Sequence, residues 1–347
     1  MPDRVRVVTA YMPALNALRG RPVSEEVSRR VEAALDAERI ELVMETDERA
    51  RLEALEGAEF YLCRNDPLPR GFFERGRRLR LIHAGTVFGE RIGLESAAAA
   101  GVPVAGFQRP IVDSVADHAM ALLLALSRNL LEAARRARGE WRGPLSPTRP
   151  DGSAYNWAQV QGMRRLRGMR LGILGMGEIG RGLAQRAKGF GMPVRYWNRT
   201  TLPKWIDRKI GAKPVDKATL FGSSDVLFLG VWLREDTRHI VGKRELEALP
   251  RGAVLLNLGR GPLVDQEALL GALREGRLGG AGLDVFEPEP FPVDHPLLRH
   301  PNVIPTGHVA GGDDALLATE LEAFFANVHR VLAGKRPRGI MNGVRWR

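Results

Sequence analysis

The feature that most constrains the fold is an alternation of short apolar runs with helical stretches, which occurs in two series. The first series begins at Arg4 and contains VRVV, IELV, AEFYLC, LRLIH and GVPV, with helical patterns such as Glu25–Asp36 and Ile92–Ala100 between them. The second begins at Arg170 and contains RLGILG, MPVRYW, SDVLFLGV, AVLLNL, AGLDVF and NVIP. This rhythm is typical of parallel sheets with crossover helices. We therefore predict an α/β protein with two parallel sheets, the second having six strands.

The length of the chain and the order of the two series predict two domains. A chain of 347 residues exceeds what one hydrophobic core usually serves. After Gly312 a helical pattern from Ala315 to Ala333 returns, and we expect this helix to pack on the first domain. The second domain would then be an insertion. We assign residues 1–113 and 309–347 to a flavodoxin-like domain and residues 114–308 to a Rossmann-like domain.

Two distinctive segments connect the series. Residues Ser114 to Arg136 read as a helix that opens with a capping-box-like pair, Ser114 and Asp117, and continues with Ala, Leu and Met. This helix is apolar enough to be buried, and a second subunit is one candidate for covering it. The following segment, Gly139 to Arg167, is rich in Pro, Gly and Arg without periodicity, so we predict an extended surface excursion.

Composition narrows the class of protein. With 44% hydrophobic and 27% charged residues, the chain resembles an ordinary globular protein. The net charge of +11 is spread along the sequence without interleaved aromatic residues, so we expect no nucleic-acid partner. The longest apolar run, Ala119 to Leu126, is far shorter than the roughly 18 residues of a membrane span. A single cysteine, Cys63 in FYLC, suits a buried strand and a cytoplasmic location.

The segment RLGILGMGEIG predicts a dinucleotide site. Its glycines have the spacing G-x-G-x-x-G and stand between an apolar strand and a helix. The first allows a tight turn, the second lets the backbone approach a pyrophosphate, and the third permits close packing of helix on strand. The helix N-terminus would hold the phosphate charge. The predicted cofactor contacts in this turn are Gly175, Met176, Gly177, Glu178, Ile179 and Gly180.

The end of the following strand bears on the choice between NADP and NAD. Asn198 occupies the place where an acid that binds the ribose 2′-hydroxyl is expected. An uncharged residue there would not repel a 2′-phosphate, and Arg199 and Thr200 could donate hydrogen bonds to one. We therefore favour NADP. NAD remains the alternative, with Arg199 stacked on the adenine edge or in solvent.

Three polar residues each follow a predicted strand of the second domain, where ligands of open α/β sheets gather. They are Arg260 in NLGRGPLVD, Glu289 in GLDVFEPEP and His308 in VIPTGHVAGG. Together with SVADHAMALLLALSRN, LRGMRLGILGMGEIG and SDVLFLGVWL, these segments resemble the D-isomer-specific 2-hydroxyacid dehydrogenases, in the order of that family and over nearly the whole chain.

The resemblance implies a role for each residue. Arg260 would clamp the substrate carboxylate and polarise the adjacent ketone, which suits its planar fork. His308 would act as the general acid and base, and Glu289 would pair with it and favour the imidazolium. Asp284 would lie near the nicotinamide carboxamide, although an aspartate that caps a strand end is an equally simple interpretation. Further cofactor contacts would come from Val231, Trp232, Leu258 and Gly259.

In the first domain, the family binds the substrate carboxylate through backbone amides, and the matching residues are Gly85, Thr86 and Val87. Phe88 and Glu90 depart from the usual pattern of this loop, so the identity of the substrate stays open. The implied reaction interconverts a small 2-oxo acid and a D-2-hydroxy acid in a homodimer. Two alternatives remain: a cofactor-sensing, corepressor-like binding protein, and a formate or phosphite dehydrogenase. No His, Cys or carboxylate cluster has zinc-ligand spacing, so we predict no metal.

Overall fold

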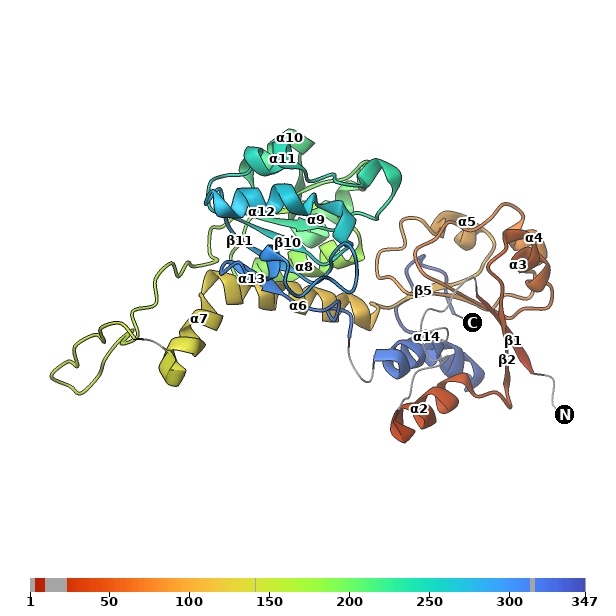
Figure 1. Cartoon of the computed structure of the whole chain (residues 1–347). Coiled ribbons are helices and arrows are strands. Elements are labelled where there is room, and N and C mark those ends of the chain that lie inside the picture. Colours follow the sequence, from red (N-terminus) through yellow and green to blue (C-terminus); the bar gives the residue numbers. More distant parts are fainter. Residues whose placement is uncertain (1–3, 10–23, 141, 313–315, 347) are drawn as a thin grey trace. The chain divides into compact units, whose positions relative to one another are not determined.

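The chain forms two compact units that are interleaved in sequence (Figure 1). The computed structural model describes residues 4–9, 24–140, 142–312 and 316–346. Unit 1 consists of Met1–Val112 and Gly312–Arg347, and unit 2 of Asp113–Gly311. The chain of unit 1 is therefore interrupted by the whole of unit 2.

Unit 1 is built on a parallel sheet of five strands in the order β2-β1-β3-β4-β5. All four residues of β3 and of β4 are buried, as expected for strands covered on both faces. The strands are β1 (Val5–Thr9), β2 (Ile40–Met44), β3 (Phe60–Cys63), β4 (Leu81–Ala84) and β5 (Val104–Gly106). The helices are α2 (Glu25–Leu35), α3 (Glu48–Ala54), α4 (Phe72–Arg75), α5 (Leu94–Ala99) and α14 (Leu316–Leu332).

Helix α14 returns to unit 1, as the sequence predicted, although Ala315 of that prediction lies outside the described residues. It lies against α2 and β4. Arg30 of α2 forms an ion pair with Glu322 of α14, with 2.7 Å between Nε and Oε1. The last helix of the chain thus completes the core of the first unit.

Unit 2 is built on a parallel sheet of seven strands in the order β12-β11-β10-β9-β6-β7-β8. The strands are β6 (Leu171–Leu174), β7 (Val194–Trp197), β8 (Ala212–Pro214), β9 (Val226–Leu229), β10 (Ala253–Asn257), β11 (Leu278–Leu283) and β12 (Val303–Pro305). The helices include α8 (Glu178–Gly189), α9 (Lys204–Ile210), α10 (Lys217–Ser223), α11 (Lys243–Ala248), α12 (Gln266–Arg274) and α13 (Pro296–Arg299), with short 3₁₀ turns η2 (Glu235–Thr237) and η3 (Gly261–Leu263).

The fold class is confirmed, since both units are α/β with parallel sheets. The count of six strands in the second series is wrong, because β8 adds a seventh at the edge. Its sequence, AKP, has three residues, two of them exposed, and ends in proline. An edge strand of this kind pairs on one side only and shows no hydrophobic period that could reveal it.

The long apolar helix begins and ends elsewhere than predicted. Helix α6 spans Pro110–Ser127, so Ser114 lies inside it rather than at its cap. Proline suits the first turn of a helix because its fixed φ is helical and it lacks an N–H that would go unused. The chain breaks at Asn129, whose φ is 51°, before α7 (Leu130–Arg135) and a π turn, η1 (Arg136–Glu140).

Helix α6 is long and apolar enough to cross a membrane by length and composition. Its apolar side instead packs on β11 of unit 2. A Cβ added to Gly282 would lie 3.0 Å from Leu122 Cβ, so the strand accepts the helix only because glycine stands there. Arg186 of α8 holds the first turns through Asp113 at 2.8 Å and Asp117 at 2.6 Å. These contacts identify α6 as a core helix of unit 2.

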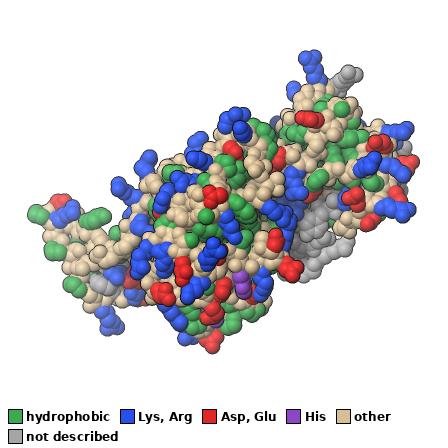
Figure 2. Space-filling model, turned by 90° about the horizontal axis from the view of Figure 1, so that it is seen from above, with side chains coloured by type: hydrophobic (Ala, Val, Ile, Leu, Met, Phe, Trp, Pro, Cys, Tyr) green, Lys and Arg blue, Asp and Glu red, His purple; other side chains and the backbone are tan. Residues whose placement is uncertain are grey.

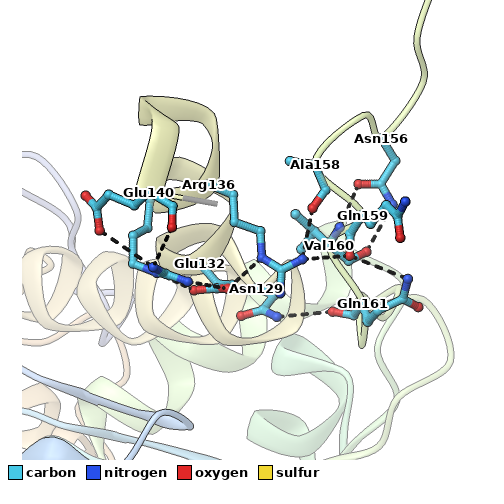
Figure 3. Close-up of polar contacts among 10 residues, drawn as sticks. Asn129, Glu132, Arg136, Glu140, Asn156, Ala158, Gln159, Val160 and Gln161 are labelled. Carbon is cyan, nitrogen blue, oxygen red and sulfur yellow. Dashed lines mark hydrogen bonds and ion pairs between the residues drawn. The ribbon is translucent and has the colours of Figure 1, made fainter. Parts of the chain in front are cut away.

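An arm projects from the body of unit 2 (Figure 1). Residues 142–167, all of which the structure describes, contain no helix or strand, and we call residues 142–160 the arm. Two side chains from the preceding helical segment hold the base of the arm by its backbone carbonyls (Figure 3). Arg136 Nη1 donates to the carbonyl oxygens of Ala158 and Gln159 at 2.9 Å, and Asn129 Nδ2 donates to that of Gln161 at 3.1 Å. Elsewhere, Lys and Arg side chains are spread over the visible face rather than gathered in one patch (Figure 2).

Candidate active site

The glycine turn after β6 has the geometry that a pyrophosphate needs. Gly175 has a φ of 101°, and a Cβ there would lie 2.6 Å from the carbonyl carbon of Gly230. A Cβ on Gly180 would lie 3.0 Å from the oxygen of Gly175, so the third glycine lets α8 pack closely. Around Gly177, by contrast, a Cβ would meet nothing within 4 Å. The second glycine therefore faces open space at the N-terminus of α8, where an anion fits.

Asn198, at the end of β7, supports this turn directly. Its Oδ1 accepts a hydrogen bond from the backbone N–H of Met176 at 2.6 Å. The next residues, Arg199 and Thr200, are exposed. Arg199 Nη1 lies 3.7 Å from the Oδ2 of Asp236 in η2, a neighbour that sequence reasoning did not identify. The guanidinium of Arg199 and the amide of Asn198 thus follow β7 where a carboxylate would otherwise be expected.

The other predicted cofactor contacts lie at the same edge of the sheet. The register pairs Leu174 of β6 with Leu229 of β9, and Leu229 with Asn257 of β10, so the segments that follow these strands are neighbours. Leu258 is buried, whereas Trp232 is 71% exposed. The residues on these segments are Val231, Trp232, Leu258 and Gly259; Glu178 and Ile179 follow Gly177 in the first turn of α8.

His308 and Glu289 form a hydrogen-bonded pair. The distance from His308 Nδ1 to Glu289 Oε2 is 2.8 Å, and the other carboxylate oxygen accepts the N–H of Phe286 at 2.9 Å. Burial alone would raise the pKa of Glu289, but these hydrogen bonds and the charges of His308 and Arg260 hold its pKa below the usual value. The carboxyl is therefore ionised near neutral pH. With Nδ1–H donated to it, Nε2 is the nitrogen that can exchange a proton with a substrate.

Arg260 follows β10, and the backbone around it is held by Asn257, the last residue of that strand. Asn257 donates from Nδ2 to the Arg260 carbonyl at 2.9 Å, and its Oδ1 accepts the N–H of Gly259 at 3.2 Å. The guanidinium is exposed, and its charge acts on Glu289. The structure thus brings Arg260, Glu289 and His308 together at the carboxyl ends of neighbouring strands. Asn257, which is 1% exposed, is a supporting residue that sequence reasoning missed.

Asp284 is almost completely buried, with 1% of its surface exposed. Its carboxylate accepts hydrogen bonds from Thr306 Oγ1 at 2.5 Å and from the N–H groups of Val309 and Ala310 at 2.9 Å each. His118 Nε2 lies 3.1 Å from Thr306 Oγ1. Sequence reasoning passed over both residues, because His118 lies on α6 and Thr306 follows β12, 188 positions away along the chain.

The predicted substrate loop lies in unit 1, directly after β4. The N–H of Gly85 donates to the carbonyl of Cys63 at 2.8 Å. A Cβ on Gly85 would lie 2.9 Å from Arg109 Cδ and 3.0 Å from Phe324 Cζ, so only glycine fits. Thr86 is buried, and its Oγ1 accepts the N–H of Phe88 at 3.2 Å; Val87 is half-buried. The loop is thus a tight turn that packs closely against Arg109 and Phe324. In the described part of the chain no group of three or more His, Cys, Asp or Glu side chains could hold a metal ion.

Comparison with known proteins identifies the family. The family described as D-isomer specific 2-hydroxyacid dehydrogenase, NAD binding domain, matches residues 120–310. A glyoxylate reductase from Thermococcus litoralis is 36% identical over 279 residues, which are 80% of this chain and 81% of that protein. A glyoxylate/hydroxypyruvate reductase B from Yersinia enterocolitica is 35% identical, with 74% of this chain and 76% of that protein covered.

Comparison with solved structures supports the same family. The crystal structure of a glyoxylate reductase from Paecilomyes thermophila superposes with a TM-score of 0.57 at 26% identity, covering 98% of this chain and 99% of that one. The family predicted from the sequence is therefore confirmed. The chain belongs to the D-isomer-specific 2-hydroxyacid dehydrogenases and is an oxidoreductase of that family with a nicotinamide-binding domain.

Proposed function

We propose that this enzyme reduces a small 2-oxo acid to the D-2-hydroxy acid with NADPH, and catalyses the reverse oxidation, in the cytoplasm. The observation that carries the proposal is the 2.8 Å contact between His308 Nδ1 and Glu289 Oε2 beside Arg260, at the sheet edge that also bears the glycine turn. An ionised carboxylate behind an imidazole favours the imidazolium, which is the acid that ketone reduction requires.

Each group has a chemical task in this proposal. The nicotinamide, when bound, supplies or accepts the hydride. Arg260 binds the substrate carboxylate with its two-pronged guanidinium and polarises the ketone. His308 donates the Nε2 proton to the ketone oxygen and takes it back in the oxidation, while Glu289 stabilises the charged ring. The backbone amides of Gly85, Thr86 and Val87 in unit 1 are further candidates for binding a carboxylate.

The preference for NADP rests on the charges after β7. The side-chain oxygen of Asn198 is engaged by Met176, and Arg199 is exposed beside it. A 2′-phosphate would meet a guanidinium rather than a carboxylate on this strand, and charge-assisted hydrogen bonds of that kind are strong. Arg199 would have to leave Asp236, which lies 3.7 Å from it, in order to bind the phosphate. NAD, with Arg199 on the adenine edge, remains the second possibility.

Turnover of defined substrates tests the function. Because relatives are named glyoxylate and hydroxypyruvate reductases, we expect glyoxylate and hydroxypyruvate to be reduced, and NADPH to give a higher kcat/KM than NADH. The measurement is the decrease in absorbance at the reduced nicotinamide band, with pyruvate and longer 2-oxo acids in the same panel. Oxidation of formate or phosphite with no 2-oxoacid reduction would overturn the proposal, and cofactor binding without any turnover would favour a sensor.

We also propose that the enzyme is a homodimer that uses the arm. Exposed apolar side chains concentrate on the arm and on α7 at its base, and hydrophobic side chains stand on this projecting part of the surface (Figure 2). They are Leu130 (55% exposed), Leu131 (58%), Leu145 (61%), Tyr155 (73%) and Trp157 (40%). Exposed apolar side chains that gather on one projecting segment often mark an interface, and a second copy of the chain can cover such a segment symmetrically.

Sedimentation velocity tests this assembly. The wild-type protein is expected to sediment as a dimer, and the double variant Leu145→Ser with Tyr155→Ser to shift toward monomer, because each change removes apolar area from the contact. Val293→Ser is the matched control, since Val293 is 84% exposed but lies outside the arm. A monomeric wild type, or an arm variant as dimeric as the control, would refute the arm as the interface.

A further inference from the structure

The backbone of His308 has an unusual conformation. Its φ is 58°, in the left-handed region that residues with a Cβ adopt rarely. It is preceded by Gly307 and leads toward Gly311, the last residue of unit 2. Residues in this region persist where the surrounding structure holds them, and such positions gather at functional sites.

One residue receives three consecutive backbone N–H groups around this position. The carbonyl of Asp284 accepts the N–H of His308 at 2.7 Å, and its carboxylate accepts those of Val309 and Ala310 at 2.9 Å each. Three successive donors that converge on a single residue determine the direction of the chain there. The left-handed turn at His308 is therefore built around the end of β11.

The carboxylate of Asp284 is itself held in place. The Thr306 hydroxyl donates a hydrogen bond to Oδ1 at 2.5 Å, which leaves its oxygen to accept one from His118 Nε2 at 3.1 Å. His118 belongs to α6, the core helix of unit 2. A chain of hydrogen bonds thus runs from α6 through Thr306 to Asp284 and ends at the backbone of His308. Since Asp284 is 1% exposed, water does not compete for these bonds.

We propose that Asp284 is a positioning residue for His308, and that Thr306 and His118 orient its carboxylate. By gathering the N–H groups of residues 308–310, it imposes the left-handed backbone from which the imidazole reaches Glu289. This inference rests on the proposed function, since it assumes that His308 is the acid. It is distinct from a role in binding the nicotinamide carboxamide, because it concerns the three donors of the polypeptide that the carboxylate accepts.

The test replaces Asp284 with Asn, which keeps the shape but presents an N–H to the N–H of Ala310 or Val309. We expect kcat to fall by about 10- to 100-fold, the usual consequence of a catalytic group displaced by about 1 Å, with the cofactor Kd unchanged. The loss should appear in kcat rather than in KM, because Arg260, which would bind the substrate carboxylate, is untouched. In the crystal structure of the variant, His308 Nδ1 should lie beyond hydrogen-bond distance of Glu289.

Two further variants separate positioning from general loss of stability. Thr306→Val removes the hydroxyl that orients the carboxylate and should lower kcat in the same direction by less, whereas Thr306→Ser should restore it. Ser224→Ala is the matched control: Ser224 is 1% exposed and donates to Leu220 O at 2.5 Å, so it loses a buried hydrogen bond of unit 2 far from His308. It should lower the Tm without changing kcat.

The outcomes distinguish this inference from the proposed function. A D284N crystal structure in which His308 keeps its left-handed backbone and its contact with Glu289 overturns the positioning role, whatever the activity. A raised cofactor Kd with that geometry intact assigns Asp284 to the cofactor instead. If His308→Asn turns over as fast as the wild type, the proposed function fails, but the crystallographic result still decides whether Asp284 sets the backbone.

Discussion

Replacing His308 with Asn is expected to lower kcat for 2-oxoacid reduction by about 10² to 10⁴-fold, the usual contribution of a positioned acid or base. Asparagine retains polarity and one hydrogen bond to Glu289 but has no proton to transfer at neutral pH. Cofactor affinity should survive, because the glycine turn lies on a different strand end. Steady-state kinetics and a fluorescence titration with NADPH measure the two quantities separately.

The control for this variant is His300→Asn. His300 belongs to the same unit but is half-buried at the C-terminus of α13, where its Nδ1 accepts the N–H of Asn302 at 3.2 Å. Its replacement should leave kcat unchanged, since an asparagine oxygen can accept the same bond. Equal activity of the His308 and His300 variants would remove His308 from the mechanism and leave proton transfer to another group.

The pair also has a pH signature. Because hydrogen bonds from His308 and Phe286 hold the pKa of Glu289 below its usual value, its carboxylate persists as the pH falls through the range where a free glutamate takes up a proton. A depressed carboxyl pKa means that the stabilising pair is present above the unfolded-state pKa and is lost only as the pH falls through the folded-state value. Reduction should therefore remain active at mildly acidic pH.

Replacing Glu320 with Met is expected to destabilise the protein by about 3 to 5 kcal/mol, the cost of leaving a buried charge without its partner. Glu320 of α14 and Arg109, just after β5, are 4% and 5% exposed, and Arg109 Nε donates to Glu320 Oε1 at 2.6 Å. The same arginine packs against Gly85, so the loss should also disturb the predicted substrate loop. Urea unfolding of the full chain measures the change.

Two controls make this prediction specific. Glu322→Gln removes a charge two residues away on the same helix, from a pair with Arg30 whose side chains are 40% and 32% exposed, and should change the free energy of unfolding by only about 0 to 1 kcal/mol. The double variant Arg109→Met with Glu320→Met removes both charges, so it should be far more stable than E320M alone. If E320M is as mild as E322Q, the buried pair has no special importance.

Local sequence patterns were sufficient to predict much of the fold and the position of the candidate site. The β-branched runs and the helical stretches between them are local signals, and so is the glycine spacing from Gly175 to Gly180. They were sufficient for two parallel α/β domains, for a glycine turn between β6 and α8, and for the family. The residues that follow strands, Arg260, Glu289 and His308, could be singled out because parallel strands deliver their carboxyl ends to one edge. The structure places these three together.

What the sequence by itself determined, then, was the type of fold and the edge of the sheet that carries the candidate active site. Only the tertiary structure decided that Asp284 gathers the backbone of His308, that Thr306 and His118 brace it, and that Arg109 meets Glu320 in the core. The physical reason is sequence separation: the Arg109–Glu320 contact joins residues 211 apart, and nothing in the neighbourhood of either residue encodes its partner. Periodicity specifies which face of an element is buried, whereas the identity of a buried polar partner depends on which elements pack together.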